Sequence, residues 1–449
     1  MFENIIGQNA IALIKQDLEN DTLPPSILFA GPEASAKGTA ALELARILSC
    51  EMETALWNCP CLSCAHHRNL SHPDLLVLGP RIFQAEIAAC KSVYLSEPES
   101  VSTKMLFLRS VRKLLLRFSP VVWEGDHNIS KLNKFIEPVL DKLEEFCADQ
   151  NDIQKISEIC SKIYEACKGL ETEGISGTIH TSHIRHASGW LRMGPNGRRK
   201  TLIIENAEKM NDAARNSLLK ILEEPPATAS IVLTSTNYRN LPPTILSRLR
   251  VYHFSRRSKE DEASVLKRIF RYEKPQTQDS ACDGENPILV FQNTFLSVSR
   301  DSLYPAAAYF LSSIAASAII LSRQRNAGIP ADAALVSIGK YCAPIAEQAH
   351  FNKHDTDIKT ITSSIMKAAD KFESRSMFPV FISLLYSALS KSLACENNAE
   401  AIACREVLKK YAEEARSAVE IYNQTPLLAL ERLAIELRGG LSFINKVEM

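Results

Sequence analysis

Residues 201–254 carry the clearest pattern of buried strands and amphipathic helix in the chain. The apolar run 202–204 is too short for a helix and ends in a carboxylate, Glu205, which is typical of a buried strand. A stretch with helical spacing of its apolar positions follows and stops at a pair of prolines. The apolar run 230–233 then ends in the polar cluster 234–237. Strand, helix and strand in this order predict a parallel α/β sheet that presents polar groups at its carboxyl edge.

The segment between about residues 80 and 177 shows helical periodicity instead. Apolar positions recur every three or four residues over 104–118, 130–146 and 152–167. This predicts three amphipathic helices that pack on one another as a small bundle. A basic helix can contact DNA or an acidic partner, but for the first of these segments we favour a solvated basic face. Its basic residues are Lys104, Arg109, Arg112, Lys113 and Arg117.

The pattern becomes almost wholly helical towards the C-terminus. Alanine, leucine and serine dominate residues 286–449, with helical periodicity and few β-branched runs, which predicts an all-α domain. The polar stretch 273–287 contains proline and glycine and is typical of a linker. We therefore expect an α/β domain at 1–255, a short helical segment and linker at 256–285, and an all-helical domain at 286–449.

Composition narrows the possible functions. The chain has 449 residues, of which 45% are hydrophobic and 23% charged, as in ordinary globular proteins. Its 52 lysines and arginines balance 52 aspartates and glutamates, whereas a protein that binds nucleic acid alone carries a basic excess. This neutrality indicates a member of an assembly. No apolar run approaches the ~20 residues that span a bilayer, and the first residues lack a signal pattern, so we expect a cytoplasmic protein without membrane contact.

Four of the twelve cysteines cluster in the segment 50–64, at Cys50, Cys59, Cys61 and Cys64. Four soft ligands so close together can close a tetrahedral zinc site with no open coordination position. The step between Cys59 and Cys61 is tighter than the C-x2-C pairs usual in zinc loops. We predict a structural Zn²⁺ site, and the alternative is a set of free or core thiols.

A candidate phosphate-binding loop lies at residues 26–39. The apolar run 26–30 predicts a strand, Gly31 begins a loop and Lys37 opens a helix. This is the topology of a P-loop, in which backbone N–H groups and a helix N-terminus hold phosphates. Gly31 and Lys37 match the first glycine and the lysine of the pattern G-x-x-x-x-G-K-[ST].

Three positions of this loop depart from the pattern. Ala36 replaces the second glycine, and alanine takes a positive φ less readily. Gly38 removes the hydroxyl that would hold Mg²⁺, while Thr39, one position later on a helix, points about 100° away. Residual nucleotide binding through the loop and Lys37 is one interpretation. We favour the other, in which the loop serves only as a scaffold.

Several strings in this order resemble the ATPase domain of bacterial clamp loaders, a group within the AAA+ family. They are FENIIGQ at 2–8, HPDLLVL at 72–78, LLKILEEPP at 218–226 and TILSR at 244–248. The resemblance implies an AAA+ P-loop domain of parallel sheet and flanking helices, followed by a helical lid and an all-α collar domain. It does not cover the helical insertion at about 80–177.

The resemblance also implies roles for individual residues. In such proteins the strand that here ends in Glu205 normally ends in Asp-Glu, one for magnesium and one to orient water, and Asn206 cannot act as a base. Thr236 matches the position that senses a γ-phosphate. Ser247 and Arg248 match a motif whose arginine enters the ATP site of a neighbouring subunit. Outside this family such an arginine is mostly a solvated surface residue.

A chain that keeps this arginine but lacks the hydroxyl and base of its own site is similar to the delta-prime type of clamp-loader subunit. The resemblance implies a part in the DNA polymerase III holoenzyme, helping to load the sliding clamp on primed DNA. Its partners would be the gamma/tau and delta subunits, and ATP/Mg²⁺ binding in its own site would be weak or absent. The alternative is a gamma/tau-like ATPase motor subunit, in which Lys37 and Glu205 suffice for slow turnover.

Overall fold

The structure is a computed structural model of the chain. It describes residues 1–52, 55–126, 128–148, 152–273, 286–296, 300–325, 333–352, 355–368, 374–394, 396, 399–420 and 424–442. The chain divides into two compact units, Met1–Asn293 and Thr294–Met449. Most of the expected linker at 273–287 lies outside the described residues.

A five-stranded parallel sheet forms the centre of the N-terminal unit. The strand order is β2-β3-β4-β1-β5, and every pair is parallel. The strands are β1 Ser26–Ala30, β2 Leu75–Leu78, β3 Lys200–Ile204, β4 Ala229–Ser235 and β5 Arg250–His253. This sheet confirms the α/β AAA+ fold class predicted from the sequence. Because the strands are parallel, the residues that follow β1, β2, β3 and β4 meet at one edge.

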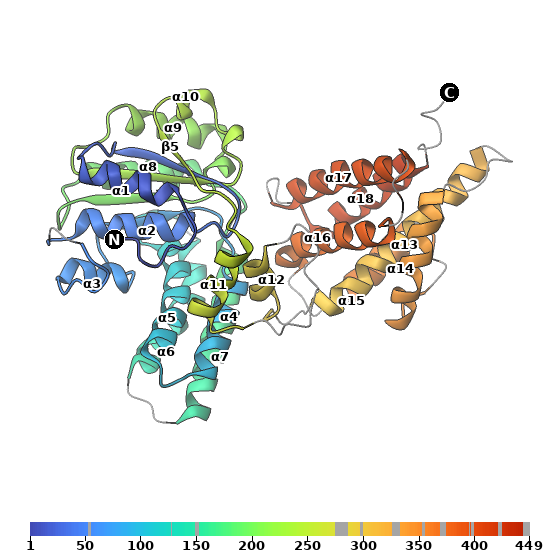
Figure 1. The fold of residues 1–449 in the computed structure, drawn as a ribbon, viewed down its shortest axis with the longest axis horizontal. Coiled ribbons are helices and arrows are strands. Elements are labelled where there is room, and N and C mark those ends of the chain that lie inside the picture. Colours follow the sequence, from blue (N-terminus) through green and yellow to red (C-terminus); the bar gives the residue numbers. More distant parts are fainter. Residues whose placement is uncertain are drawn as a thin grey trace. The chain divides into compact units, whose positions relative to one another are not determined.

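Helices cover both faces of this sheet (Figure 1). On one face, α1 (Ala10–Glu19) and α2 (Lys37–Ser49) share a core with alternate strand residues such as Phe29 and Val232. The intervening residues, such as Leu28 and Ile231, are fully buried as well. The helix α8 (Thr181–Arg192) packs against β3 and against α9 (Asp212–Glu223). Burial on both faces explains why the strands appear as continuous apolar runs.

The described residues of the insertion form four helices, whereas the sequence predicted three. They are α4 Gln84–Ser96, α5 Val101–Leu115 with the 3-10 turn η1 Leu116–Phe118, α6 Ile129–Cys147 and α7 Ile153–Gly174. The missed helix is α4, which packs against α5 and α7 (Figure 1). Most of its residues are buried all round the helix, so it lacks the single apolar stripe that reveals an amphipathic helix.

The prediction of a solvated basic face on the second insertion helix, α5, is wrong. None of its five basic side chains is exposed. The ammonium group of Lys104 lies over the ring of Phe146. The other four contact polar groups outside their own helix. Arg109 and Arg112 donate to backbone carbonyls of residues 67–69. Lys113 binds the carboxylate of Glu86, and Arg117 binds the carboxylate of Glu205. The three arginines therefore attach the insertion to the sheet domain, whereas the two lysines contact other helices of the insertion.

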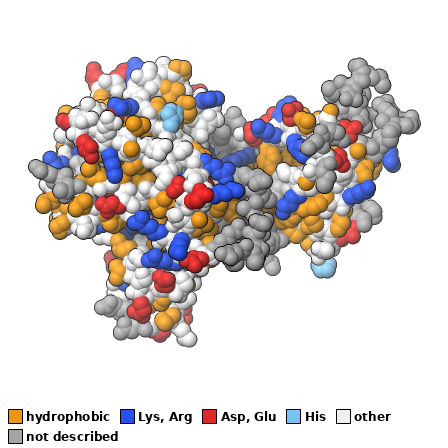
Figure 2. Space-filling view, viewed as in Figure 1, with side chains coloured by type: hydrophobic (Ala, Val, Ile, Leu, Met, Phe, Trp, Pro, Cys, Tyr) orange, Lys and Arg blue, Asp and Glu red, His pale blue; other side chains and the backbone are white. Residues whose placement is uncertain are grey.

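Shorter elements complete the N-terminal unit. They are α3 Leu62–Arg68, η2 Ala207–Lys209, η3 Tyr238–Asn240, α10 Pro243–Leu246, α11 Lys259–Phe270 and α12 Pro287–Asn293. The helix α11 corresponds to the expected lid segment. On the face shown in Figure 2, acidic and basic side chains are interspersed over this unit, in keeping with the balanced charge of the chain.

The C-terminal unit is all-helical in its described residues, as the sequence predicted. Its helices are α13 Arg300–Arg325, α14 Ala333–Gln348, α15 Ile358–Ala368, α16 Ser374–Ser392, α17 Ala399–Glu420 and α18 Pro426–Leu441. One correction concerns α13. Its stretch Leu303–Gln324 is long and apolar enough to cross a membrane, contrary to the expectation that no run approaches that length. Most of this stretch is buried in the core that α13 shares with α14 and α16, as a core helix of this composition would be.

Candidate functional site

The loop between β1 and α2 retains the backbone path of a phosphate-binding loop. Gly31 is needed here, because a Cβ on it would lie 2.1 Å from the carbonyl oxygen of Phe254. Ala36 has φ 69° and ψ 17°, so it takes the left-handed conformation that the pattern assigns to glycine. Ala34 also has a positive φ, of 55°. An L-residue in this region costs about 1 kcal/mol or more, so the loop is held in place by its surroundings.

Lys37 is directed at its own loop. Its Nζ donates to the carbonyl oxygens of Gly31 at 2.6 Å and Pro32 at 2.5 Å, and it lies 3.3 Å from Ser35 Oγ. Only 7% of the residue is exposed. Burial lowers the pKa of Lys37 to about 8, although the charge of Glu208 acts in the opposite direction. All three donors of the ammonium group thus have protein partners.

Glu205 follows β3 at the same sheet edge and is bound to two arginines. Its Oε1 lies 3.3 Å from Arg81 Nη1, and its Oε2 accepts a hydrogen bond from Arg117 Nη2. Arg81 comes from the turn after β2 and Arg117 from η1 at the end of the insertion helix α5. Burial by itself raises the pKa of Glu205, but Arg117 and Arg81 together hold it below its ordinary value. The carboxylate is therefore ionised and already neutralised.

The space beside the first turn of α2 is filled by this carboxylate. A Cβ on Gly38 would lie 2.3 Å from Glu205 Oε1 and 3.1 Å from Arg81 Nη1. The hydroxyl-bearing residue of the P-loop pattern thus has no room at position 38 unless Glu205 moves. Thr39 is exposed, as expected for a residue that points away from the loop.

We tested whether these residues fit a magnesium-bound triphosphate, and they do not. Mg²⁺ binds through carboxylate and hydroxyl oxygens and keeps several of its waters. Here the hydroxyl is absent at Gly38, and the carboxylate of Glu205 is shared by two guanidinium groups. Asn206 follows in the position of a base, and its Nδ2 lies 3.5 Å from the Pro80 carbonyl oxygen. An amide cannot accept a proton from water at neutral pH.

Thr236 follows β4 at the same edge, but its contacts are with η2. Its backbone N–H and its hydroxyl donate to Glu208 Oε1 at 3.0 Å and 2.6 Å. The charge of Glu208 in turn acts on Lys37. The structure therefore brings Gly31, Lys37 and Glu205 to one edge of the sheet, with Thr236 beside them through Glu208.

Arg248 lies elsewhere. It comes after α10 and directly before β5, whose first residue, Arg250, pairs with Ile27 at the start of β1. The candidate phosphate loop follows the other end of β1. Arg248 therefore lies at the amino edge of the sheet, opposite to the loop that contains Lys37. It cannot serve the site of its own chain.

The side chain of Arg248 is held on the surface. Its Nη2 lies 2.7 Å from Glu223 Oε1 at the end of α9, and its Nη1 donates to the Thr244 carbonyl oxygen at 2.7 Å. The preceding Ser247 is exposed and donates to the same carbonyl at 3.2 Å. The side chain of Arg248 is 33% exposed and that of Glu223 50%. An exposed pair of this kind contributes at most about 1 kcal/mol, so the guanidinium is available to a stronger anionic partner.

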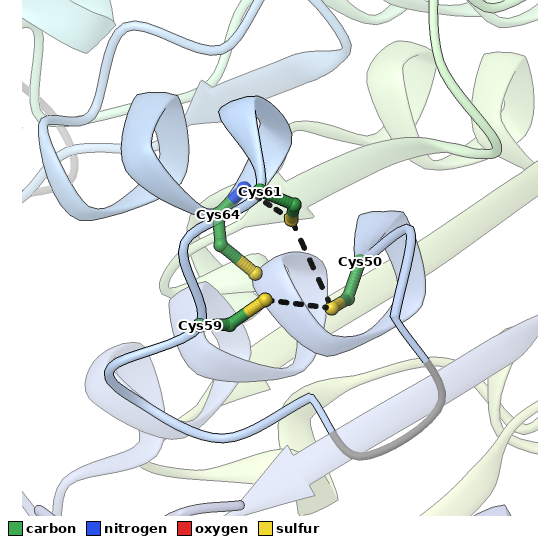
Figure 3. Close-up of side chains that lie close together, drawn as sticks. All are labelled: Cys50, Cys59, Cys61 and Cys64. Atoms are coloured by element: carbon green, nitrogen blue, oxygen red, sulfur yellow. Dashed lines mark hydrogen bonds between the residues drawn. The ribbon is translucent and has the colours of Figure 1, made fainter.

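Figure 3 shows the four cysteines converging from the end of α2 and from α3 with the loop before it. Their sulfur atoms all lie within 4.8 Å of one another. Cys50 Sγ is 3.7 Å from Cys59 Sγ and 4.0 Å from Cys61 Sγ. Tetrahedral zinc with Zn–S bonds of about 2.3 Å places its sulfurs about 3.8 Å apart. The cluster therefore fits a metal ion such as zinc, and all four ligands come from the protein.

Hydrogen bonds prepare one of these sulfurs, that of Cys61, to act as a thiolate. Cys61 begins α3, and its Sγ accepts from the backbone N–H of Cys64 at 3.4 Å. Burial alone would raise the pKa of Cys61, but backbone hydrogen bonds from Glu51 and Cys64 lower it to about 7. The pKa of Cys64 is raised by burial and by hydrogen bonds with Cys50 and Cys61, and the 3.0 Å hydrogen bond that Arg46 donates to its sulfur offsets only part of this.

Arg46 holds the cysteine segment to α2, although the sequence drew no attention to it. The residue is 1% exposed, and its Nε and Nη2 bind both carboxylate oxygens of Glu43, at 2.9 Å and 2.7 Å. Its remaining N–H groups donate to the Ala55 and Leu56 carbonyls and to Cys64 Sγ. All five N–H donors of the guanidinium are therefore satisfied. The i,i+3 spacing of Glu43 and Arg46 on α2 was the only signal in the sequence.

Arg81 and Arg117 were also missed as site residues. Arg81 stands three positions after β2, and β2 pairs with β3, so the shared sheet edge was a signal for it. Arg117 was counted among the basic residues of its helix, but nothing in the local pattern relates it to Glu205, which is 88 residues away.

Comparison with known proteins identifies the family. The family model described as DNA polymerase III, delta subunit, matches residues 6–129 and 125–258, together more than half of the chain. The tau subunit of DNA polymerase III from Bacillus subtilis is 28% identical over 145 residues, covering 29% of this chain and 26% of that protein. The delta' subunit of DNA polymerase III from Pseudomonas aeruginosa is 39% identical over 80 residues, covering 18% of this chain and 24% of that protein.

The chain thus spans about a quarter of the length of these relatives. Among solved structures, a DNA polymerase III gamma subunit-related protein from Thermotoga maritima is 18% identical, over 59% of this chain and 80% of that one. The TM-score is only 0.28, so no conclusion rests on it. The match of the family model to more than half of the chain is sufficient: the chain belongs to the family described as the delta subunit of DNA polymerase III.

Proposed function

We propose that this chain is a delta-prime-like subunit of a bacterial clamp loader that does not hydrolyse ATP itself. In this proposal it donates Arg248 to the ATP site of a neighbouring gamma/tau subunit in the cytoplasm. Together with the delta subunit, the complex would place the sliding clamp of the DNA polymerase III holoenzyme on primed DNA. The all-α C-terminal unit would serve as the collar that joins the subunits, and α11 as the lid.

One observation carries this proposal: the chain separates its arginine from its own phosphate loop. Arg248 lies at the amino edge of the sheet and the loop at the carboxyl edge. The guanidinium is exposed, and within the described part of the chain it is bound only by an exposed glutamate and by backbone and hydroxyl oxygens. A planar guanidinium with five donors is suited to a triphosphate supplied by a partner. In related nucleotide hydrolases such an arginine accelerates turnover by about 10³–10⁵-fold.

Reconstitution of the complex tests this assignment. Replacing Arg248 by alanine is expected to abolish turnover at the one ATP site that faces this subunit, and Arg248→Lys to restore it only in part, because an ammonium cannot bind two oxygens in parallel. The matched control is Arg185→Ala, which removes an exposed arginine from α8. Equal ATPase rates for the Arg248→Ala and Arg185→Ala complexes would reject the donor role.

A second candidate function is that of an ATPase motor of the gamma/tau type. It is favoured by the similarity to tau subunits, including 36% identity over 77 residues to the tau subunit of DNA polymerase III from Salmonella typhimurium, which covers 17% of this chain and 12% of that protein. The isolated chain separates the two functions. ATP hydrolysis that Lys37→Ala abolishes would establish the motor, whereas no hydrolysis above the buffer rate is expected for the donor.

We further propose that the four cysteines hold a structural zinc ion. The sulfur–sulfur distances and the four thiol ligands that the protein itself supplies support this role. Zinc would fasten the loop after α2 and would take no part in phosphate chemistry.

A further inference from the structure

A cluster of five charged residues joins the insertion to the carboxyl edge of the sheet. Glu205 is paired with Arg81 and Arg117. Glu86 of α4 is paired with Arg81 at 2.6 Å and with Lys113 of α5 at 2.5 Å. Three cations thus surround two carboxylates, and three of the five residues come from the insertion helices or the turn that ends them.

The two arginines that bind Glu205, here called the arginine pair, are held in place by an aromatic ring. The guanidinium carbon of Arg81 lies 5.2 Å and that of Arg117 5.3 Å from the ring centre of Phe83, which is fully buried. Such cation–π contacts add to the ion pairs in orienting the two guanidinium groups. The positions of both arginines are therefore fixed by the surrounding structure.

The position of the arginine pair coincides with the missing metal site. Glu205 Oε1 and Arg81 Nη1 fill the space that a side chain at Gly38 would occupy. In the P-loop pattern that side chain and the carboxylate after the neighbouring strand hold the divalent cation. A divalent cation entering here would meet two positive charges that already share a single carboxylate. Lys37 is a third positive charge near enough for Glu205 and Arg81 to affect its pKa. Repulsion therefore excludes the divalent cation.

We propose that the insertion supplies a permanent internal substitute for the divalent cation. The arginine pair neutralises Glu205, closes the carboxyl edge of the sheet to magnesium, and lets the N-terminal unit keep its structure without nucleotide. This inference deepens the proposed function, since it rests on the assignment of no turnover to this site. It also gives the helical insertion a role: α4, α5 and η1 bring Glu86, Lys113 and Arg117 to the place that a metal would otherwise stabilise.

Melting of the full chain tests the substitution. Intrinsic tryptophan fluorescence reports only on the N-terminal unit, because Trp57, Trp123 and Trp190 all belong to it. The probes are MgCl₂ alone and MgCl₂ with ATP, both at millimolar concentration. For the wild-type chain we expect the same melting temperature with and without either probe, because a ligand that does not bind the folded state cannot stabilise it.

Variants of the arginine pair should reverse this behaviour. Arg81→Gln changes a side chain that is 35% exposed and leaves the buried Arg117 in place, so this variant is expected to fold. Arg117→Met removes the buried partner. Both should melt at a lower temperature, and magnesium should recover part of the loss through Glu205. Adding Glu205→Gln to Arg117→Met should remove both the loss and the response to magnesium. Adding it to Arg81→Gln should remove only the response, because the buried Arg117 then lacks its carboxylate partner. Arg112→Met, on the same helix and bonded to Asn69, is the matched control without a magnesium response.

Two results would overturn the inference. One is that magnesium raises the melting temperature of the wild-type chain and no longer does so in the Glu205→Gln variant. The other is an Arg81→Gln or Arg117→Met variant that shows no response to magnesium, whatever its stability. Neither measurement involves Arg248 or a partner subunit. An Arg248→Ala complex with an unchanged ATPase rate would therefore reject the donor role but not this inference. A negative result in the melting experiments would reject this inference but not the donor role.

Discussion

Replacement of Arg46 by methionine probes how the cysteine segment is held. The change keeps the length of the side chain but removes five hydrogen bonds, among them the two to Glu43, which is 7% exposed. Breaking a buried ion pair by removing one partner costs about 3–5 kcal/mol, because the other charge is left buried without compensation. We therefore expect the N-terminal unit to lose about 3–5 kcal/mol of its free energy of unfolding. We also expect metal affinity to fall about 10–100-fold, as for other groups that donate to a metal ligand.

Urea unfolding followed by tryptophan fluorescence measures the first effect, since the three tryptophans lie in this unit. Competition with a chromogenic zinc chelator measures the second. The matched control is Arg68→Met, because Arg68 also binds this segment, through the Trp57 and Cys59 carbonyls, but forms no hydrogen bond or ion pair with a carboxylate or thiol of the described residues. The double variant Glu43→Leu/Arg46→Met should recover most of the lost stability, because no charge is then left unpaired. A loss of less than about 1 kcal/mol for Arg46→Met would refute this reasoning.

Three further predictions follow from the same structure. Elemental analysis of chain purified without chelator should find one zinc per chain and none after Cys59→Ser combined with Cys64→Ser; a metal-free native chain would eliminate the site. Gly38→Ser restores the hydroxyl of the P-loop pattern, yet it should lower the melting temperature, because its Cβ would lie 2.3 Å from Glu205 Oε1. Adding Glu205→Asp should relieve the loss, and an unchanged melting temperature for Gly38→Ser would contradict this contact. Burial raises the pKa of Glu86, but Lys113 and Arg81 outweigh it and bring the pKa to about 2. In the unfolded chain the pKa of Glu86 is about 4.3, so the shift stabilises the folded state by at most about 3 kcal/mol. This stabilisation is present above pH ~4.3 and is lost as the pH falls towards 2. A Glu86→Gln variant should lose less stability over that range, and equal losses in the two proteins would count against the pairing.

Much of the N-terminal unit could be predicted from sequence because its signals are local. Strands β1 to β4 are buried on both faces, and the run 202–204 with its terminal Glu205 shows this within a few residues. The convergence of the four cysteines could be predicted as well, since three of them lie within six residues of one another. In these cases the residues that form the sequence pattern are also the residues that form the strand or the cysteine cluster.

The remaining features depend on contacts between distant segments. Helix α4 escaped prediction because burial on all sides hides its amphipathic pattern. The basic residues of α5 were expected in solvent, yet Arg117 finds Glu205 only when the insertion folds back onto the sheet edge. A periodicity argument separates apolar from polar positions, but it cannot distinguish a solvated arginine from one that is buried and paired.

The most direct test of the central claim compares two complexes that each contain one altered copy of this chain. The rate of ATP hydrolysis by the reconstituted clamp loader is measured with Lys37→Ala and with Arg248→Ala. If the chain does not turn over ATP, as we propose, the Lys37→Ala complex should match the wild-type rate and the Arg248→Ala complex should lose the activity of one site. A complex impaired by Lys37→Ala and indifferent to Arg248→Ala would contradict the account.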